Sequence, residues 1–234
     1  MAEVAFRLDQ TGLLVVDPYN DFISEGGKLW PRVREVVEEN GCIPHMIQIL
    51  KAARSAAVRI FFSPHHRWRS GDYETWQFWA PIQERAAHSK VFADGSWGGT
   101  FRDEFTPQAG EIVASEHWCS SGFANTDLDL QLKKHEIHQL IVIGLRANTC
   151  IDSTVRYAAE LGYEVTLVND AIGSYSWDEM KATLELNAPN YARAILSTKE
   201  LIASIQKFGR LRRTRRNALG CGGFAAQPSR SRPL

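Results

Sequence analysis

The chain has 234 residues, of which 44% are hydrophobic, and its basic and acidic side chains balance to a formal net charge of zero. This length and apolar content suit one domain with a single core. No apolar run approaches the length that crosses a membrane, and the N-terminal segment lacks the apolar stretch of a signal peptide. We therefore expect a cytoplasmic protein rather than a membrane-embedded one.

Charge is distributed unevenly along the chain. Residues 209–234 contain seven arginines and no acidic residue, which leaves 20 basic against 27 acidic residues, or about −7, in residues 1–208. An acidic surface repels phosphate, so we exclude nucleic acid as a partner of the globular part. We expect one domain over residues 1–208 and a basic, disordered tail over residues 209–234. A silent extension is favoured for this tail, and a targeting or nucleic-acid role stays open.

Short apolar runs of strand length recur along the chain, and helical patterns fall between most of them. The predicted strands are 12–17, 58–63, 111–115, 140–145, 164–168 and 193–197. The predicted helices are 33–53, interrupted near Gly41 and Pro44, and 126–135, 150–161, 178–187 and 198–205. This alternation predicts an α/β fold of three layers, α/β/α, with a six-stranded, mostly parallel, Rossmann-like sheet.

Two residues with reactive side chains follow predicted strands. The first strand ends at Asp17, and the fourth leads into Cys150. If the strand order is 3-2-1-4-5-6, a ligand binds outside the carboxyl ends of strands one and four, where the order reverses. Both positions then face one crevice. The turn Asp17-Pro-Tyr-Asn-Asp-Phe22 lacks the pattern Gly-x-Gly-x-x-Gly, which argues against a dinucleotide ligand.

Cys150 lies where an apolar strand turns into a helix. Gly144 permits a sharp turn, and Asn148 or Thr149 can cap a helix whose first turn includes Cys150. The unpaired backbone N–H groups and the helix dipole at that position favour an anion, so we expect the pKa of the thiol to fall. A buried, inert cysteine is the alternative.

Residues 65–105 are rich in aromatic residues and contain several glycines. The stretch is too long for an ordinary connection, which indicates a lid, a pocket wall or a subunit contact. Aromatic rings at this density suit interfaces as well as pockets. We favour an interface from which some residues reach a pocket.

Three segments stand out together: Asp17-Pro-Tyr-Asn-Asp-Phe22, Ser121-Gly-Phe-Ala-Asn-Thr-Asp-Leu128 and Gly144-Leu-Arg-Ala-Asn-Thr-Cys150. In this order and spacing they resemble the isochorismatase-like cysteine hydrolases, a superfamily that includes nicotinamidases, N-carbamoylsarcosine amidohydrolases, ureidoacrylate and biuret hydrolases, and isochorismatases. The resemblance covers about residues 10–206. It implies the sheet order 3-2-1-4-5-6, a small-molecule substrate and a homo-oligomer, either a dimer or a tetramer.

The same resemblance implies roles for individual residues. Cys150 matches the family's nucleophile, and Asp17 matches the general base that takes the thiol proton. The peptide between Leu145 and Arg146 matches a cis bond, which would turn the Arg146 N–H, together with the Cys150 N–H, toward an oxyanion. The residues assigned to substrate binding are Asn20, Phe22, Trp118 and Arg146.

The family has a lysine at the end of the third strand, which this chain lacks. Counted from the strand, the position falls on Glu116, and counted back from the motif Phe123-Ala-Asn-Thr126 it falls on His117. We assign Glu116, because a strand fixes side-chain direction. Asp17 and Glu116 would then share a proton, since two close carboxylates do not both ionise easily. His117 or Arg146 would have to supply the positive charge.

We predict no metal and no cofactor. Nicotinamidases carry an Asp-x-His-x-x-x-His type metal site after the second strand, and the matching segment here, Ser63-Pro-His-His-Arg-Trp68, lacks that aspartate and spacing. The four cysteines show no zinc-site spacing. The paired histidines of this segment could still touch the substrate. A carboxylate on the substrate could be bound by Arg67, Arg69 or Arg146.

We therefore expect a hydrolase that cleaves a small amide, ureido or vinyl-ether substrate, with the amide type favoured. Cys150 would be the nucleophile and Asp17 the base, with Glu116 or His117 in place of the lysine. The alternative is a homologue that lost catalysis with the lysine and acts as a binding or structural oligomer. An isochorismate hydrolase would attack through water rather than through Cys150.

Overall fold

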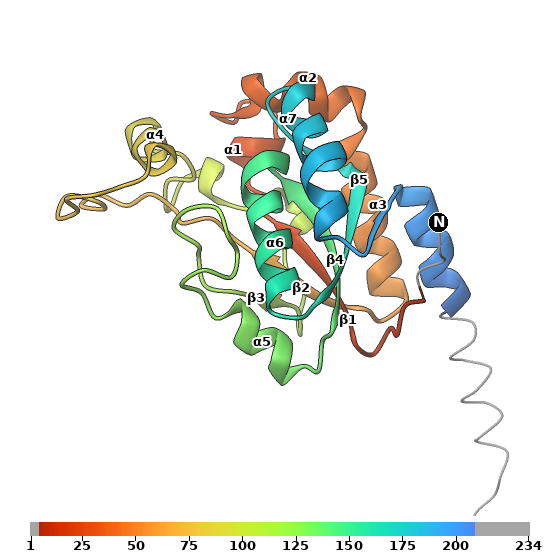
Figure 1. Cartoon of the computed structure of the whole chain (residues 1–234). Helices are drawn as coiled ribbons and strands as arrows, with labels where there is room; N and C mark the ends of the chain where they lie inside the picture. The colour runs from red at the N-terminus through yellow and green to blue at the C-terminus, as the bar shows by residue number, and fades with distance from the viewer. Residues whose placement is uncertain (1–4, 209–234) are drawn as a thin grey trace, which may run out of the picture.

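One six-stranded parallel sheet forms the centre of the protein (Figure 1). The computed structural model describes residues 5–208, and its strands run in the order β3-β2-β1-β4-β5-β6. The strands are β1 (Thr11–Val16), β2 (Arg59–Ser63), β3 (Ile112–Val113), β4 (Gln139–Leu145), β5 (Glu164–Gly173) and β6 (Ala194–Leu196). The predicted α/β fold and sheet order are confirmed. The predicted tail, residues 209–234 with Cys221, lies outside the described residues.

The two central strands, β1 and β4, are buried on both faces. Leu13 and Val15 of β1 pack into the core on one face of the sheet, while Leu14 and Val16 pack into the core on the other. Successive side chains of a strand point to opposite faces. A strand covered on both faces is therefore an unbroken apolar run, which is why these two were readily predicted.

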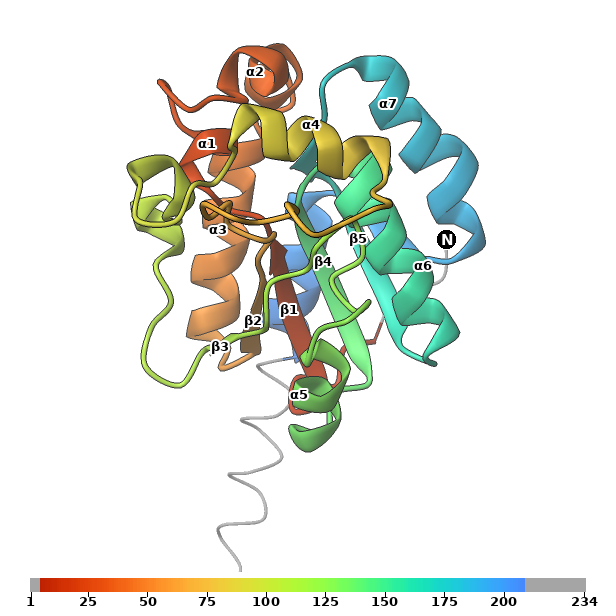
Figure 2. The same cartoon turned by 90° about the vertical axis from the view of Figure 1, so that its left-hand side faces the viewer.

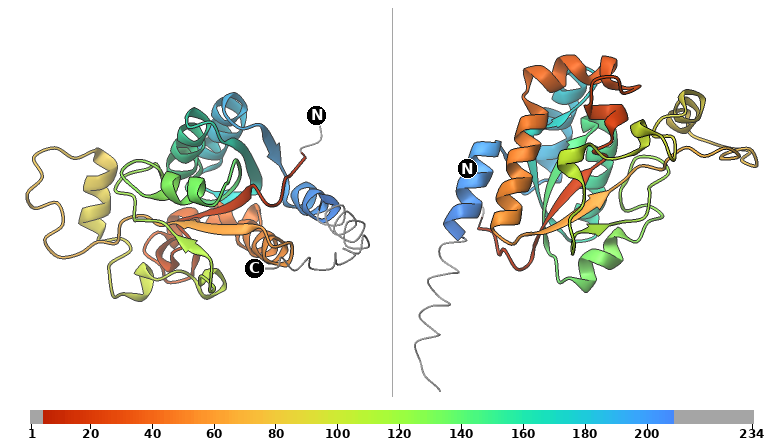
Figure 3. Two further views of the ribbon diagram at one scale, coloured as in Figure 1. Left: turned by 90° about the horizontal axis from the view of Figure 1, so that it is seen from below. Right: turned by 180° about the vertical axis from the view of Figure 1, so that it is seen from behind.

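Helices cover both faces of this sheet (Figure 3). Met46 of α3 and Leu201 of the helix at 198–208 pack on one face, and Leu132 of α5 and Val155 of α6 pack on the other. The α-helices are α1 (Asn20–Ile23), α2 (Trp30–Glu39), α3 (Cys42–Ser55), α4 (Pro81–Ser89), α5 (Leu128–Lys134), α6 (Asp152–Glu160) and α7 (Trp177–Lys181). The 3₁₀ segments are η1 (Trp97–Gly99), η2 (Asp103–Phe105) and η5 (Ala188–Asn190), and the π segments are η3 (Ala147–Ile151) and η4 (Ala182–Asn187). Within residues 5–208, none of the helices combines the length and the apolar character that a bilayer crossing requires.

The long connection between β2 and β3 extends away from the sheet before it returns. The part of the connection that runs from the end of β2 through α4 forms an arm on one side of the molecule (Figure 1). The exposed rings of Trp76, Phe78 and Trp79 lie on this arm. The subunit contact proposed for this segment stays a prediction. The returning chain forms β3 with only two residues, fewer than the five predicted, at the edge of the sheet beside β2.

The carboxyl ends of β1 and β4 lie side by side. Val16 pairs with Gly144, and α1, α2, α4 and α7 gather at this end of the sheet (Figure 2). Gly144 has a φ of 124°, and a Cβ atom there would lie 2.1 Å from the Val16 carbonyl oxygen. Only glycine permits this conformation and this close approach. The turn brings Asp17 and the segment that leads to Cys150 to one crevice.

Candidate active site

Three side chains of different chemistry meet in this crevice. Asp17 follows β1, His117 follows β3, and Cys150 lies in η3 directly after β4. A carboxylate oxygen, an imidazole nitrogen and the Sγ atom of these residues all lie within 4.8 Å of one another. Asp17 and His117 are fully enclosed, and Cys150 is 4% exposed. The cluster combines a carboxylate, an imidazole and a thiol in a site that excludes bulk water.

His117 contacts Asp17 directly. Its Nε2 atom lies 3.1 Å from Asp17 Oδ1. The backbone around His117 continues the pairing of β3 with β2, because the His117 N–H donates to the Pro64 carbonyl and the His66 N–H donates to the His117 carbonyl, each at 2.9 Å. Side chains of an extended segment alternate in direction. When His117 faces Asp17, its two sequence neighbours face away.

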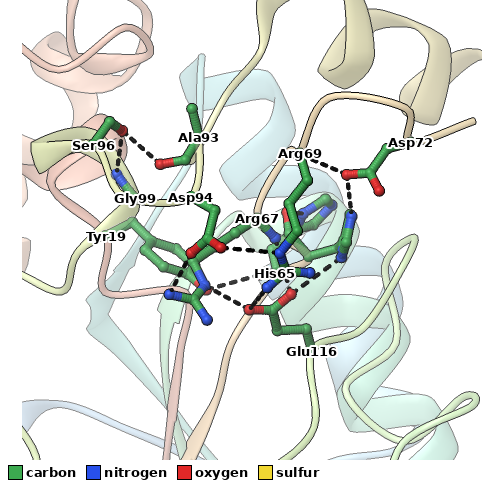
Figure 4. A network of polar contacts seen from close by, with 11 residues as sticks. Tyr19, His65, Arg67, Arg69, Asp72, Ala93, Asp94, Ser96, Gly99 and Glu116 are labelled. Carbon is green, nitrogen blue, oxygen red and sulfur yellow. Dashed lines mark hydrogen bonds and ion pairs between the residues drawn. The ribbon is translucent and has the colours of Figure 1, made fainter.

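Glu116 accordingly lies elsewhere, and the assignment of this residue to the lysine position is corrected. Its carboxylate accepts hydrogen bonds from the His66 ring and from the backbone and guanidinium of Arg67, and it also pairs with Arg69 (Figure 4). Burial opposes ionisation of Glu116, but these hydrogen bonds outweigh it and lower the pKa of the carboxyl to about 2. The expected shared proton with Asp17 is therefore replaced by an ion-pair network.

The Cys150 thiol is harder to ionise than its position in the sequence suggests. Burial, and then the nearby Asp17 carboxylate, raise its pKa well above the ordinary value. Hydrogen bonds from the Thr149 hydroxyl and the Arg146 backbone N–H act in the opposite direction but do not outweigh these effects. The predicted fall in the pKa of Cys150 is wrong, because the effect of burial exceeds that of the helix terminus. The resting side chain is therefore a thiol.

A pocket of about 400 Å³ opens onto Cys150. Phe22, His65 and Phe92 form part of its wall. Three arginines from separate helices and loops also line it: Arg32 of α2, Arg85 of α4 and Arg146 after β4. The guanidinium groups of Arg32 and Arg146 lie over the Tyr175 ring, at 3.9 and 3.8 Å from its centroid. The pocket thus joins the Cys150 thiol to a cationic wall.

The family model of the isochorismatase domain matches residues 11–200. This chain belongs to the isochorismatase family. The predicted assignment to this superfamily and to the hydrolases is confirmed. Ureidoacrylate amidohydrolase RutB of Serratia proteamaculans (strain 568) is 30% identical over 179 residues, which cover 72% of this chain and 71% of that protein. The protein of the same name from Yersinia enterocolitica is 30% identical over 178 residues, covering 72% of this chain and 77% of the relative.

Two solved structures share the fold. The cysteine hydrolase of Pseudomonas syringae pv. phaseolicola 1448A superposes with a TM-score of 0.74 at 22% identity, over 88% of this chain and 96% of that chain. The N-carbamoylsarcosine amidase of Thermoplasma acidophilum superposes with a TM-score of 0.58 at 21% identity, over 81% and 96% of the two chains.

Of the four residues assigned to substrate binding, two line the pocket. Phe22 and Arg146 are part of its wall. Asn20 instead points its amide at the Trp97 carbonyl and the Thr100 hydroxyl, where it holds the neighbouring loop. Trp118 stacks on the His66 ring with centroids 3.6 Å apart, on the side where Glu116 lies. The alternation that directs His117 inward directs Trp118 away. The assignments of Asn20 and Trp118 to substrate binding are therefore corrected.

The peptide bond between Leu145 and Arg146 is cis in the structure, as the resemblance implied.

The arginines proposed for a substrate carboxylate divide into two groups. Arg67 and Arg69 are paired with Glu116 and Asp94. Arg146 lines the pocket, where it lies 4.0 Å from the Glu179 carboxylate.

Three pocket residues lacked a sufficient signal in the sequence. Arg32, Arg85 and Tyr175 come from segments with no motif, and nothing in their local pattern separates them from surface residues. His65 was noticed, because two histidines directly follow a strand. Its Nδ1 lies 2.9 Å from the His66 carbonyl, and burial and then His117 lower its pKa to about 4. His65 is therefore a neutral ring in the pocket wall.

Proposed function

We propose that this protein is a cysteine amidohydrolase that cleaves a small amide or ureido substrate bearing a carboxylate. The observation that carries the proposal is the enclosed cluster of Asp17, His117 and Cys150 at the base of a cationic pocket. The names of the ureidoacrylate amidohydrolases support a C–N bond as the target.

Cys150 is the nucleophile in this proposal. Asp17 takes the thiol proton as the sulfur attacks the carbonyl carbon, and the carbonyl electron pair moves to the oxygen. The backbone N–H of Arg146, which already contacts the sulfur, and that of Cys150 stabilise this oxyanion. The C–N bond breaks as the oxyanion collapses, and the leaving nitrogen takes the proton from Asp17. Water then hydrolyses the thioester and restores the thiol.

His117 takes the place of the family lysine. The contact of its imidazole with Asp17 Oδ1 orients the carboxylate toward the sulfur. The loss of the lysine is therefore offset by a residue one position further along the chain than Glu116. This contact favours the enzyme over the alternative, a homologue without activity.

The cationic wall indicates the substrate class. Arg67 and Arg69 are engaged in ion pairs outside this pocket. Arg32 and Arg146 both lie on the Tyr175 ring in the pocket wall, and Arg146 also lies 4.0 Å from the carboxylate of Glu179, the one acidic residue among the lining residues of the described chain. Guanidinium groups bind carboxylates through paired, parallel hydrogen bonds. A ureido acid would place its carboxylate at this wall and its carbonyl carbon at Cys150.

Alkylation and turnover test the proposal together. Iodoacetamide should inactivate the enzyme in step with modification of Cys150, and substrate should protect it. Cys150→Ala should lower turnover of ureido acids at least about 1000-fold, while Cys119→Ser should leave it unchanged. Full activity of Cys150→Ala would show attack by water instead of sulfur. No turnover of any amide or ureide by the wild type would favour the inactive homologue.

A further inference from the structure

We propose that Asp17, His117 and Cys150 form a binding site for Zn²⁺ or a cation of similar softness, and that this ion blocks the nucleophile. The inhibition rests on the proposed function, whereas the binding rests on the geometry alone. The sequence offered no metal-site spacing, because the three residues come from the ends of three different strands and meet only in the fold.

The donor set suits zinc. One thiolate, one imidazole and one carboxylate are ligands that Zn²⁺ accepts together, and the sulfur disfavours Mg²⁺ and Ca²⁺. Zinc–ligand bonds of about 2.0–2.3 Å place tetrahedral ligand atoms roughly 3.3–3.8 Å apart. The three ligand atoms here lie within 4.8 Å of one another, and His117 Nε2 is 3.1 Å from Asp17 Oδ1. Side-chain shifts of about 1 Å would complete the coordination.

Two atoms of the cluster lack partners within the described part of the chain. Asp17 Oδ2 and His117 Nδ1 are buried and form no hydrogen bond there. A buried carboxylate oxygen without a partner is destabilising. A cation in the cluster would satisfy the Asp17 oxygen directly, which is a second indication, independent of the distances, that this side chain is set to receive a charged ligand.

The pocket gives an ion access to the cluster and leaves room for a fourth ligand. Asp17 and His117 are enclosed, while Cys150 lines the pocket wall. An ion held by the three side chains therefore keeps one position open toward the pocket, which water or a carboxylate would occupy. Zn²⁺ takes the lone pair of His117 Nε2, so the proton that Nε2 shares with Asp17 moves to Nδ1, which has no hydrogen-bond partner among the described residues. The thiol proton of Cys150 leaves to solvent, and the sulfur electron pair used for attack becomes a metal bond.

His117 is the residue that completes the set of metal ligands. A lysine ammonium has three donors and no lone pair, so it cannot bind a metal ion and would repel one. With lysine at this position, only the carboxylate and the sulfur would remain as ligands. Zinc sensitivity is thus a property that the exchange of lysine for histidine creates.

The test uses the full chain after removal of metal with a chelator. Calorimetric titration with ZnCl₂ should show one ion bound per chain, and Co²⁺ should give the charge-transfer absorption of a cobalt–thiolate bond. His117→Lys and Cys150→Ser should each weaken Zn²⁺ binding at least about 100-fold. His138→Lys and Cys119→Ser, which change residues outside the cluster, serve as matched controls and should bind Zn²⁺ as the wild type does.

Inhibition is measured separately from binding. Bound Zn²⁺ should protect Cys150 from iodoacetamide and stop turnover, and a chelator should reverse both effects. Equal affinity of the wild type and Cys150→Ser, or the absence of a cobalt–thiolate band, would overturn the site. Activation by Zn²⁺ would overturn the inhibition. Failure of the proposed function has a different signature, namely no turnover by the metal-free enzyme whether or not it binds Zn²⁺.

Discussion

His117 Nε2 lies 3.1 Å from Asp17 Oδ1, and neither side chain is exposed. In the proposed mechanism this contact places an imidazole nitrogen at the position of the lysine that the family resemblance implies. Because Asp17 is the proposed base and also opposes ionisation of the thiol, the partner of its carboxylate determines how readily Cys150 can attack.

Replacing His117 with alanine should lower kcat about 100- to 10,000-fold while KM changes little, because the imidazole acts on Asp17 rather than on bound substrate. His117→Lys should recover part of the rate by supplying a permanent charge. Steady-state kinetics on a ureido acid would measure both variants, with the exposed His138→Ala as the control. An equal loss in His117→Lys and His117→Ala would show that charge at this position is not what matters.

Asp17→Asn should make Cys150 easier to label with iodoacetamide but should lower turnover. The Asp17 carboxylate helps to raise the pKa of Cys150, so its removal should shift the pH profile of iodoacetamide labelling to lower pH. Turnover should fall at least about 100-fold, because the base is lost. A profile shifted to higher pH would mean that Asp17 stabilises the thiolate, contrary to the geometry described above.

Arg32→Gln should raise KM about 10- to 100-fold for a substrate with a carboxylate, since one arm of the guanidinium pair around Tyr175 is lost. The amide of the same acid, which has no negative charge, should show no such change. Arg34→Gln on the same helix removes an exposed partner of Glu38 and is the matched control. Equal effects on charged and neutral substrates would contradict the carboxylate assignment.

Glu116 should influence stability rather than chemistry. Its pKa of about 2 lies below the ordinary value of 4.5, so its ionised form stabilises the fold fully above about pH 4.5 and this contribution is lost as the pH falls toward 2. Glu116→Gln should unfold more easily than the wild type at pH 7, by about 1–3 kcal/mol. The difference should shrink in denaturant titrations at lower pH, and a difference that grows would exclude the ion-pair role.

The sheet and the crevice could be predicted because their signals are local and strong. Leu13 to Val16 and Leu140 to Leu145 are unbroken apolar runs, as buried parallel strands require, and Asp17 and Cys150 follow them directly. The order of the strands, which the family resemblance implied, then places both residues in one crevice.

The choice between Glu116 and His117 could not be made in this way. They follow a strand of only two residues, which has no periodicity, so the directions of their side chains depend on hydrogen bonds to Pro64 and His66 that only the fold provides. Arg32 and Tyr175 are likewise brought together from different helices and loops. The pKa of Cys150 was misjudged because burial and the Asp17 charge, both tertiary effects, exceed the effect of a helix terminus.

The short edge strand has a consequence for how the enzyme responds to heat. β3 pairs with one neighbour only, through Ile112 and Val113, and it carries His117 into the centre of the site. Edge segments with few hydrogen bonds open at a lower free energy than the rest of a domain. Such local opening would withdraw the imidazole while β1 and β4 stay intact. Activity should therefore disappear reversibly several degrees below the temperature at which the circular dichroism of the whole sheet is lost.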